Sequence, residues 1–495
     1  MKTRITVSGL ALWLLLGSVE RLEAQLRIFG NRRDSQNQQV NPAHERAKME
    51  AEQAYERGEY QRSIDLASSV LRQNPRDDVA YYLRAGARVE LGLVQNNPQL
   101  IRSGVADARE SIRFDRKNTV MYYLPYLYGM TNLATIENRK EHAEISVKVA
   151  GQILARRTLK SDDKANLLYQ RAMASIFLQS FEKAARDYEA AIKLQRNHLG
   201  AYLGLADAYS QAGNTSKALE AYGRAVETFP DTPLVYNNRG MYLQQLEKHE
   251  EAITDFTRAI ELEPDYFYAY TNRGYTLLQS GDAVAAEADF SKSLQINSNQ
   301  STAYSLRSSS RLLQGKIKGA LSDQSQAVRL TPRDPAAHAD LGFVSFFSGD
   351  YNAAERSFAQ SLKLDPTMRH LKPWQYLTRE FNGQTTEAKK KFSPDLKPDS
   401  RSRDWIDHLM AYLLGSISDA ELLKAVSTKP PEINAAQLCE AHYFIGLRKH
   451  RSGSAKIAQQ HFQKAVQTKA TYLSAYRGAQ VALKKFSKVE DVPSR

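Results

Sequence analysis

The sequence predicts an all-α protein in which helical hairpins stack into a right-handed superhelical solenoid. The main observation is a set of small residues that recur every 34 positions: Ala184, Ala218, Ala252, Ala286, Ala320 and Ala354. A second series of small residues follows seven positions later, and an aromatic residue stands between the two series in most units. Six consecutive units in the same phase indicate an internal repeat.

Each unit contains two apolar stripes of helical period, roughly 13 residues long, separated by a turn. The turns often carry a glycine, and several units close on a proline, as at Gly281 and Pro264. We expect the helices to meet at the small residues and the aromatic residue to fill the wedge between one hairpin and the next. Gln324 stands where the other units carry Tyr or Phe. A single hairpin cannot bury both of its faces, so the units are expected to stack.

The order large–Gly/Ala–Ala–aromatic–Ala–Pro is followed nearly in full by residues 199–230 and 233–264. This order resembles the tetratricopeptide repeat (TPR) family, and the resemblance covers most of the chain. It implies an all-α solenoid that binds other proteins or peptide segments. We expect six regular units over residues 165–366 and degenerate units over 44–164, with a longer inter-helix loop around "QNNPQLI".

The repeat loses its phase after Pro366. Residues 367–437 are predicted to form an irregular helical segment with a loop at 393–403, and Ser418 with Glu421 forms a capping-box pattern. Residues 438–495 are predicted to form a final unit, a capping helix and a polar tail. Trp374, Trp405, "YLLGSISDAEL" and "CEAHYFIG" make this part resemble bacterial envelope TPR proteins of the NlpI type. That resemblance implies an exported adaptor that brings cell-wall hydrolases or proteases together.

The first 24 residues are predicted to be an export signal. Two basic residues, Lys2 and Arg4, precede an apolar core at 5–19, and the small Ala24 precedes the expected cut. The core is shorter than the ~20 residues that span a bilayer. Residues 25–43 are expected to be a polar linker. The protein is therefore predicted to be periplasmic or secreted. The alternative is that the N-terminus is not cleaved and attaches the protein to the membrane. A lipid anchor is not expected, because Ser18 stands where a lipid-bearing Cys would be needed.

Composition and motifs argue against several classes of function. The formal net charge is +13, but basic and acidic residues are interspersed, which argues against nucleic-acid binding. The single cysteine, Cys439, excludes an intramolecular disulfide and is expected to be a buried filler. No metalloprotease, phosphate-loop or serine-hydrolase motif is present, so we expect no catalysis, no metal and no cofactor. The alternatives are a glycosyltransferase-type enzyme, which needs an α/β domain, and a self-assembling structural protein; a homodimer is left open.

The TPR resemblance implies that the first helix of each unit lines the concave face. Its second, fifth, ninth, twelfth and thirteenth positions are then the ligand positions. The predicted groove residues change from amide-rich to aromatic-rich along the chain: Asn237, Met241, Gln244, Tyr268, Thr271, Tyr275, Ser305, Phe343, Phe346 and Phe347. Packing inside the array is the alternative for Phe346 and Phe347. Replacing Phe343 and Phe347 by Ala is expected to weaken partner capture while leaving melting nearly intact. Arg239 and Arg273, each in an Asn-Arg-Gly triplet, are expected either to bind a ligand carboxylate or to pair inside the array.

Overall fold

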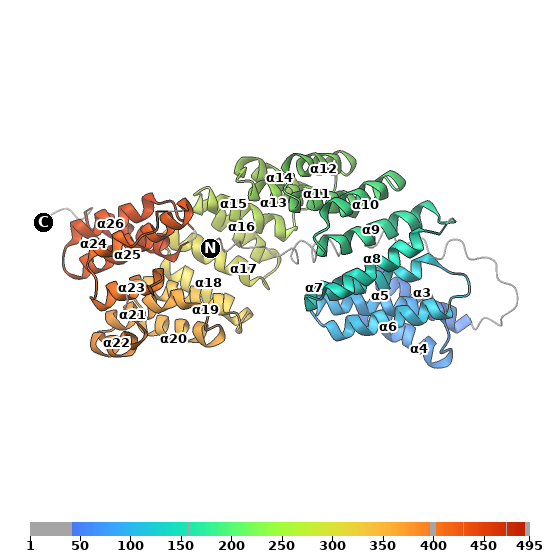
Figure 1. Cartoon of the computed structure of the whole chain (residues 1–495), viewed down its shortest axis with the longest axis horizontal. Coiled ribbons are helices and arrows are strands. Elements are labelled where there is room, and N and C mark those ends of the chain that lie inside the picture. The colour runs from blue at the N-terminus through green and yellow to red at the C-terminus, as the bar shows by residue number, and fades with distance from the viewer. Residues whose placement is uncertain (1–41, 157, 397–401, 429, 472, 491–495) are drawn as a thin grey trace. The chain divides into compact units, whose positions relative to one another are not determined.

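The computed structural model describes residues 42–156, 158–396, 402–428, 430–471 and 473–490. Within these ranges the chain forms 25 α-helices and no strand, and consecutive helices pack in pairs (Figure 1). The all-α prediction is therefore confirmed. The predicted export signal and all but the end of the predicted linker lie outside the described residues, and the first helix begins at Pro42.

The chain divides into two compact units between Arg239 and Gly240, inside helix α13. The N-terminal unit contains the degenerate repeats and the first regular ones. Its helices are α3 (Pro42–Glu56), α4 (Tyr60–Gln73), α5 (Asp78–Val94), α6 (Pro98–Phe114), α7 (Tyr123–Glu137), α8 (Lys140–Leu154), α9 (Ser161–Phe177), α10 (Phe181–Leu194), α11 (Leu199–Gln211), α12 (Thr215–Thr228) and the start of α13 (Pro233–Gln245).

The turn between α5 and α6 is short, so the longer loop predicted around "QNNPQLI" is wrong. Only residues 95–97 separate the two helices. Asn96 adopts a left-handed conformation with φ 49°, and the side chain of Asn97 accepts hydrogen bonds from the amides of Gln99 and Leu100. Pro98 is the first helical residue, a position where a missing N–H costs no hydrogen bond. The asparagines and proline therefore start a helix here.

The C-terminal unit continues the regular repeats and then changes to an irregular helical block. Its helices after α13 are α14 (His249–Leu262), α15 (Phe267–Gln279), α16 (Ala283–Ile296), α17 (Ser301–Leu313), α18 (Ile317–Leu330), α19 (Pro335–Ser348), α20 (Tyr351–Leu364), α21 (Lys372–Phe381), α22 (Thr385–Phe392), α23 (Trp405–Leu414), α24 (Asp419–Lys424), α25 (Pro431–Arg451), α26 (Ala455–Gln467) and α27 (Ser474–Glu490).

In the hairpins α15–α16 and α19–α20 of this unit, a glycine of the first helix packs against an aromatic ring of the second. A Cβ added at Gly274 would lie 2.9 Å from Cε1 of Phe290, and one added at Gly342 would lie 2.5 Å from Cδ1 of Phe358. Phe290 and Phe358 are fully buried. The close approach of the two helices therefore requires glycine, and the aromatic ring fills the wedge as expected.

The hairpin of α17 and α18 replaces this apolar contact with a polar one. Ser308 stands at the glycine position and Gln324 at the aromatic position, and each is 1% exposed. The Ser308 hydroxyl donates to the carbonyl of Ala320 at 2.8 Å, and the Gln324 amide donates to the carbonyl of Ala337 at 3.2 Å. Buried polar groups persist when they are hydrogen-bonded, and both of these are.

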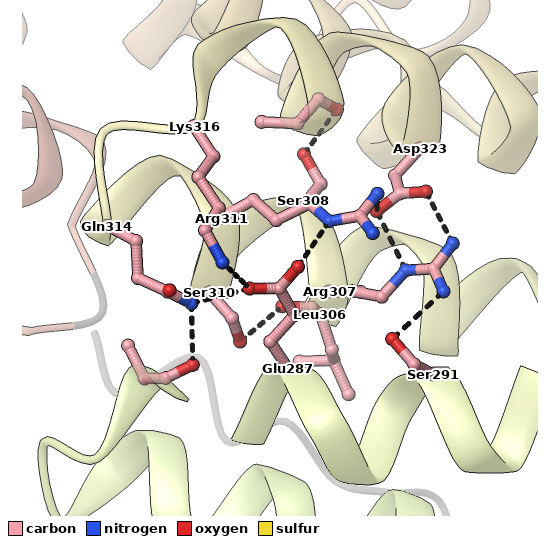
Figure 2. Close-up of polar contacts among 12 residues, drawn as sticks. Glu287, Ser291, Leu306, Arg307, Ser308, Ser310, Arg311, Gln314, Lys316 and Asp323 are labelled. Carbon is pink, nitrogen blue, oxygen red and sulfur yellow. Dashed lines mark hydrogen bonds and ion pairs between the residues drawn. The ribbon is translucent and has the colours of Figure 1, made fainter. Parts of the chain in front are cut away.

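Arginine–aspartate pairs join the two helices of several hairpins. Arg273 makes two hydrogen bonds of 2.8 Å to Asp289, and Arg307 repeats this arrangement with Asp323. The side chain of Arg273 thus pairs with an acid inside the array, which is one of the two alternatives predicted for it. Figure 2 shows the most extended network, in which Glu287 of α16 accepts hydrogen bonds from Arg311, Gln314 and Lys316.

The irregular block matches the sequence prediction in part. Ser418 and Glu421 form the predicted capping box, with the Ser418 amide donating to the Glu421 carboxylate at 2.8 Å. Helix α25, by contrast, begins at Pro431 and crosses the boundary predicted at 437 and 438. Nothing in "EINAAQLCEAHY" breaks a helix, so the helix that begins at Pro431 continues into the final repeat.

Candidate peptide-binding groove

The candidate groove is built on the first helices of the regular hairpins in the C-terminal unit, α15, α17 and α19, together with the end of α13. Equivalent side chains recur every 34 residues along these helices, so Tyr275, Ser309 and Phe343 occupy the same repeat position. The structure divides the predicted groove residues into three groups: some are accessible, some pack inside the array, and some are covered by the C-terminal part of the chain.

The accessible group, which we name the open segment, consists of Gln244, Tyr268, Tyr275 and Gln279. Tyr268 is 38% exposed, and its ring lies against that of Phe267 with the ring centres 3.9 Å apart. Gln244 donates to Gln279 at 3.3 Å, and Gln279 donates to the hydroxyl of Tyr275 at 3.2 Å. Burial raises the pKa of both tyrosines, which keeps the phenols neutral. The open segment thus offers ring faces and neutral hydrogen-bonding groups.

Thr271 and Ser305 are half-buried beside the open segment. The Thr271 hydroxyl is engaged inside the array, 2.7 Å from the Ser293 hydroxyl and 3.2 Å from the carbonyl of Phe267. The carbonyl of Ser305 accepts a hydrogen bond from the hydroxyl of Ser309 at 3.1 Å. Thr271 therefore supports the hairpin.

Asn237 and Met241 lie in the interior of α13 and do not face solvent. Asn237 is 0% exposed and Met241 is 8% exposed. The Asn237 amide donates to the side chain of Asn238 at 3.4 Å. Both were predicted as ligand positions, and the structure buries both.

Phe343, Phe346 and Phe347 are 5–7% exposed and belong to the core of the irregular block. Their ring centres lie 4.9, 5.5 and 6.0 Å from the ring centre of Trp374. In this structure these rings are therefore packed inside the array, which is the alternative predicted for Phe346 and Phe347. The burial of Phe343 and Phe347 argues against the expectation that their replacement leaves melting nearly intact, because loss of a buried aromatic ring leaves a cavity.

Helix α27 and Trp374 together cover this second stretch of the groove, which we name the covered segment. It consists of Ser309 and Leu313, the ninth and thirteenth residues of α17, and of Phe343 and Phe347 of α19. Arg477 donates to the hydroxyl of Ser309 at 3.0 Å, and Lys484 donates to the carbonyl of Leu313. Lys485 donates to the carbonyl of Phe347 at 3.4 Å. Sequence reasoning interpreted this helix only as a cap.

A stripe of small residues is the signal by which α27 could have been recognised as a packing element. Ala475, Gly478, Ala479 and Ala482 repeat at helical spacing in "SAYRGAQVALKKF". Such a stripe allows a helix to approach a neighbouring surface closely. It does not indicate which surface that is, because α27 contacts the neighbouring α25 and α26 and also residues of α17 and α19 that lie more than 130 positions away in the sequence.

The single cysteine and two histidines come together near the end of the chain without forming a metal-binding group. Cys439 is buried, and burial raises its pKa to about 12, so its thiol is unreactive near neutral pH. His442 and His461 place their Nδ1 atoms 3.0 Å apart, and burial lowers the pKa of both, that of His442 to about 4. In the described parts of the chain, no cluster of three or more His, Cys, Asp or Glu is arranged to hold a metal ion.

A shallow polar depression of about 380 Å³ lies between α23 and α25. Its charged groups bind one another. Arg448 donates to the carbonyls of Tyr412 and Leu413 at 2.7 and 2.9 Å, and Lys449 pairs with Asp419 at 2.6 Å. These contacts tie the end of α23 to α25, which gives the depression a structural role.

Family models and solved structures are similar to parts of this chain. Tetratricopeptide-repeat models match residues 178–239, 233–266 and 256–288. A structure of PilF from Pseudomonas aeruginosa is 20% identical, with a TM-score of 0.37, over 42% of this chain and 94% of its own. PilW, titled a type IV pilus biogenesis factor, gives 23% identity and a TM-score of 0.37 over 41% and 94%. YrrB, titled a TPR protein with an unusual peptide-binding site, gives 18% and 0.32 over 37% and 95%.

Among the helices that the structure describes, none combines the length and the apolar character that a membrane span requires.

Proposed function

Because the chain carries tetratricopeptide repeats, we propose that it is an exported, non-catalytic scaffold that binds segments of other proteins on the concave face of its repeats. The observation that supports this proposal is the open segment. Four side chains from α13 and α15 stand at ligand positions of the repeat and retain access to solvent. One of them, Tyr268, is a large aromatic residue left 38% exposed.

The chemistry of the open segment suits an extended or helical peptide. Tyrosine combines an apolar ring with a polar hydroxyl, and buries a large area with few rotatable bonds to order. The amides of Gln244 and Gln279 donate and accept hydrogen bonds and match the backbone of a peptide. None of the four side chains carries a charge, so we expect the ligand to be chosen by shape and hydrogen bonding.

Ion pairs within the repeats support a function without nucleic acid. The basic side chains of the repeats are engaged with acids, as in the pairs Arg171–Asp187 at 2.7 Å and Arg224–Glu189 at 2.8 Å. Counterion release from a nucleic acid requires basic groups that are available to phosphates. The guanidinium groups in these two pairs are therefore less available to phosphates.

The alternatives make different predictions. A glycosyltransferase-type enzyme would transfer the sugar of a nucleotide sugar to an acceptor or to water. Turnover of a nucleotide sugar by the purified chain would therefore favour an enzyme over a scaffold. A self-assembling protein would increase in mass with concentration. We expect neither turnover nor growth beyond a discrete species, measured by assay with nucleotide sugars and by sedimentation at several concentrations.

The direct test of the groove is a double substitution, Tyr268→Ala with Tyr275→Ala. Partners of the parent chain are first identified by affinity capture and are then measured one at a time against the variant. We expect binding to weaken about tenfold or more, because aromatic anchors dominate such interfaces. The matched control is Val284→Ala, which removes an exposed apolar side chain, 67% exposed, on the second helix of the same hairpin. Equal binding by the parent and the tyrosine variant would contradict the groove assignment.

Export is proposed from residues 1–24 alone. The expected result is a mature chain that begins at Gln25 and fractionates outside the cytoplasm, measured by intact mass and cell fractionation. A chain that keeps Met1 and fractionates with membranes would favour the tethered form. The similarity of the C-terminal part to NlpI-type envelope proteins stays a prediction, and the identity of captured partners tests it.

A further inference from the structure

Helix α27 lies on the covered segment in the way that a bound helix lies on a receptor. On one side α27 packs against α25 and α26 of the final hairpin, and on the other it contacts α17 and α19, the first helices of two regular hairpins; all five belong to the C-terminal unit. The contacts fall at ligand positions of the repeat: Arg477 binds Ser309, and Gly478 packs against Phe347. Helix-in-groove binding is a common mode of peptide recognition. Here the helix comes from the same chain.

We propose that α27 is a built-in occupant of the groove, which competes with an external helix for the surface formed by α17 and α19. This inference rests on the proposed scaffold function and deepens it, because it names the class of partner. That partner is a basic amphipathic helix with a face of small residues, the chemistry that α27 itself displays.

The small-residue face of α27 is what seats it. Ala475 and Ala479 are 2% and 0% exposed. A Cβ added at Gly478 would lie 2.6 Å from the hydroxyl of Tyr443 and 2.7 Å from Cε1 of Phe347. Contacts this short allow no side chain at that position without movement of the helix. An external helix must therefore carry glycine or another very small residue at this point.

Two lysines of α27 bind the ends of the two groove helices. Lys484 donates to the carbonyl of Leu313, the last residue of α17, and Lys485 donates to the carbonyl of Phe347, next to the end of α19. The last carbonyls of a helix lack partners within it and carry partial negative charge. Adjacent basic residues on a docked helix satisfy both ends at once. This geometry makes positive charge part of the recognition.

The contacts that hold α27 on the groove leave some buried polar atoms unsatisfied, which favours its replacement by an external helix. Among the described residues, Arg477 Nε and Gln480 Oε1 are buried without a hydrogen-bond partner. The Arg–Asp pairs of the repeats, by contrast, use the guanidinium fully, as Arg307 does with Asp323 and Ser291. Buried polar atoms without partners weaken the docked state relative to a hydrated one. An external helix that docks without such unpaired polar atoms gains over α27.

The experiment measures binding of a labelled synthetic peptide with the sequence of residues 474–490 to the full-length chain. Gly478→Ala is expected to release α27, while the added methyl group raises the helix propensity of the segment. The released surface should then bind the peptide about tenfold more tightly than the parent chain does, by fluorescence anisotropy. Hydrogen exchange should show loss of protection over residues 475–486 in the same variant.

The matched control is Gly223→Ala on α12, where an added Cβ meets no atom within 4 Å. It should bind the peptide as the parent does. A peptide with Lys484→Glu and Lys485→Glu should lose its binding to the Gly478→Ala chain. Ala479→Leu, at a fully buried position of α27, provides a second release that keeps Gly478, so the result does not depend on one substitution.

Two results would overturn the proposal: α27 stays protected in both variants, or α27 is released and the peptide binds no better. The proposed function is tested by a different experiment, the Tyr268→Ala and Tyr275→Ala substitution, because these two tyrosines lie outside the surface that α27 covers. A released surface that binds the peptide supports the inference even if the tyrosine variant keeps its partners.

Discussion

Tyr275 of α15 and Phe343 of α19 occupy equivalent positions in two repeat units that are two units apart, yet their surroundings differ. Tyr275 is half-buried, and its hydroxyl accepts a hydrogen bond from Gln279. Phe343 is 7% exposed and packs edge-on against Phe358 and Trp374. Repeat position determines which helix face a residue occupies. Whether that face is open depends on what the rest of the chain lays over it.

The covering elements lie far away in the sequence, which explains why the repeat pattern alone does not reveal them. Arg477 and Ser309, which hold α27 on the groove, are 168 positions apart. The open and covered segments therefore divide one predicted groove into a part available to ligands and a part occupied by the chain itself. This difference leads to measurable consequences for stability, for pH dependence and for accessibility.

The largest effect is expected from Phe343→Ala. Removing a buried ring from the irregular block should lower the free energy of unfolding by about 3–5 kcal/mol. Tyr275→Ala, at the equivalent open position, should lower it by about 1 kcal/mol or less. Urea unfolding followed by circular dichroism measures both. Similar losses for the two variants would remove the distinction between the segments.

A smaller gain is expected from restoring the usual packing of the α17–α18 hairpin. Ser308→Gly together with Gln324→Phe should raise the free energy of unfolding by about 1–2 kcal/mol, because a ring then fills the wedge as Phe290 and Phe358 do. Gln324→Phe alone should destabilise, since the Ser308 side chain occupies the space that the ring needs. The two changes are thus expected to be strongly non-additive. Additive effects would show that the polar pair is not a substitute for the glycine–aromatic contact.

The smallest effect concerns acid stability of the network in Figure 2. The pKa of Glu287 is lowered to about 2, because hydrogen bonds from Lys316, Arg311 and Gln314 outweigh the desolvation that would raise it. A lowered folded-state pKa stabilises above the unfolded value of about 4.5, and that contribution is lost as pH falls from there toward 2. Glu287→Gln should flatten this part of the pH–stability curve. Glu251→Gln, in an exposed pair with Lys248, should leave the curve unchanged. A curve of equal slope in Glu287→Gln and the parent would contradict the assignment.

Most of the fold was predictable because its determinants are local and periodic. Gly274 and Phe290 are separated by 16 residues, as are Gly342 and Phe358, so this contact repeats with the sequence. The capping box at Ser418 and Glu421 is equally local. The turn at Asn96–Pro98 was mistaken for a longer loop because proline in that context begins a helix.

The candidate site was predictable only where nothing distant covers it. The open residues Gln244, Tyr268 and Tyr275 keep the access that their repeat positions suggest. Phe347 does not, because Trp374 of the next helical pair packs against it, and so does α27, whose distant placement no periodicity encodes. An aromatic-rich stretch of a predicted groove is thus consistent with either a ligand surface or a core, and the burial of its neighbours separates the two.

Thiol accessibility tests the division of the groove most directly. Gln279 and Phe347 share one repeat position, and the native Cys439 is buried with a raised pKa, so it adds little background. Gln279→Cys and Phe347→Cys are each placed in the full-length chain, and the rate of maleimide labelling is measured. We predict fast labelling at 279 and labelling about 100-fold slower or more at 347, where the thiol is reached only when α27 moves away. Equal rates at the two positions would contradict the account.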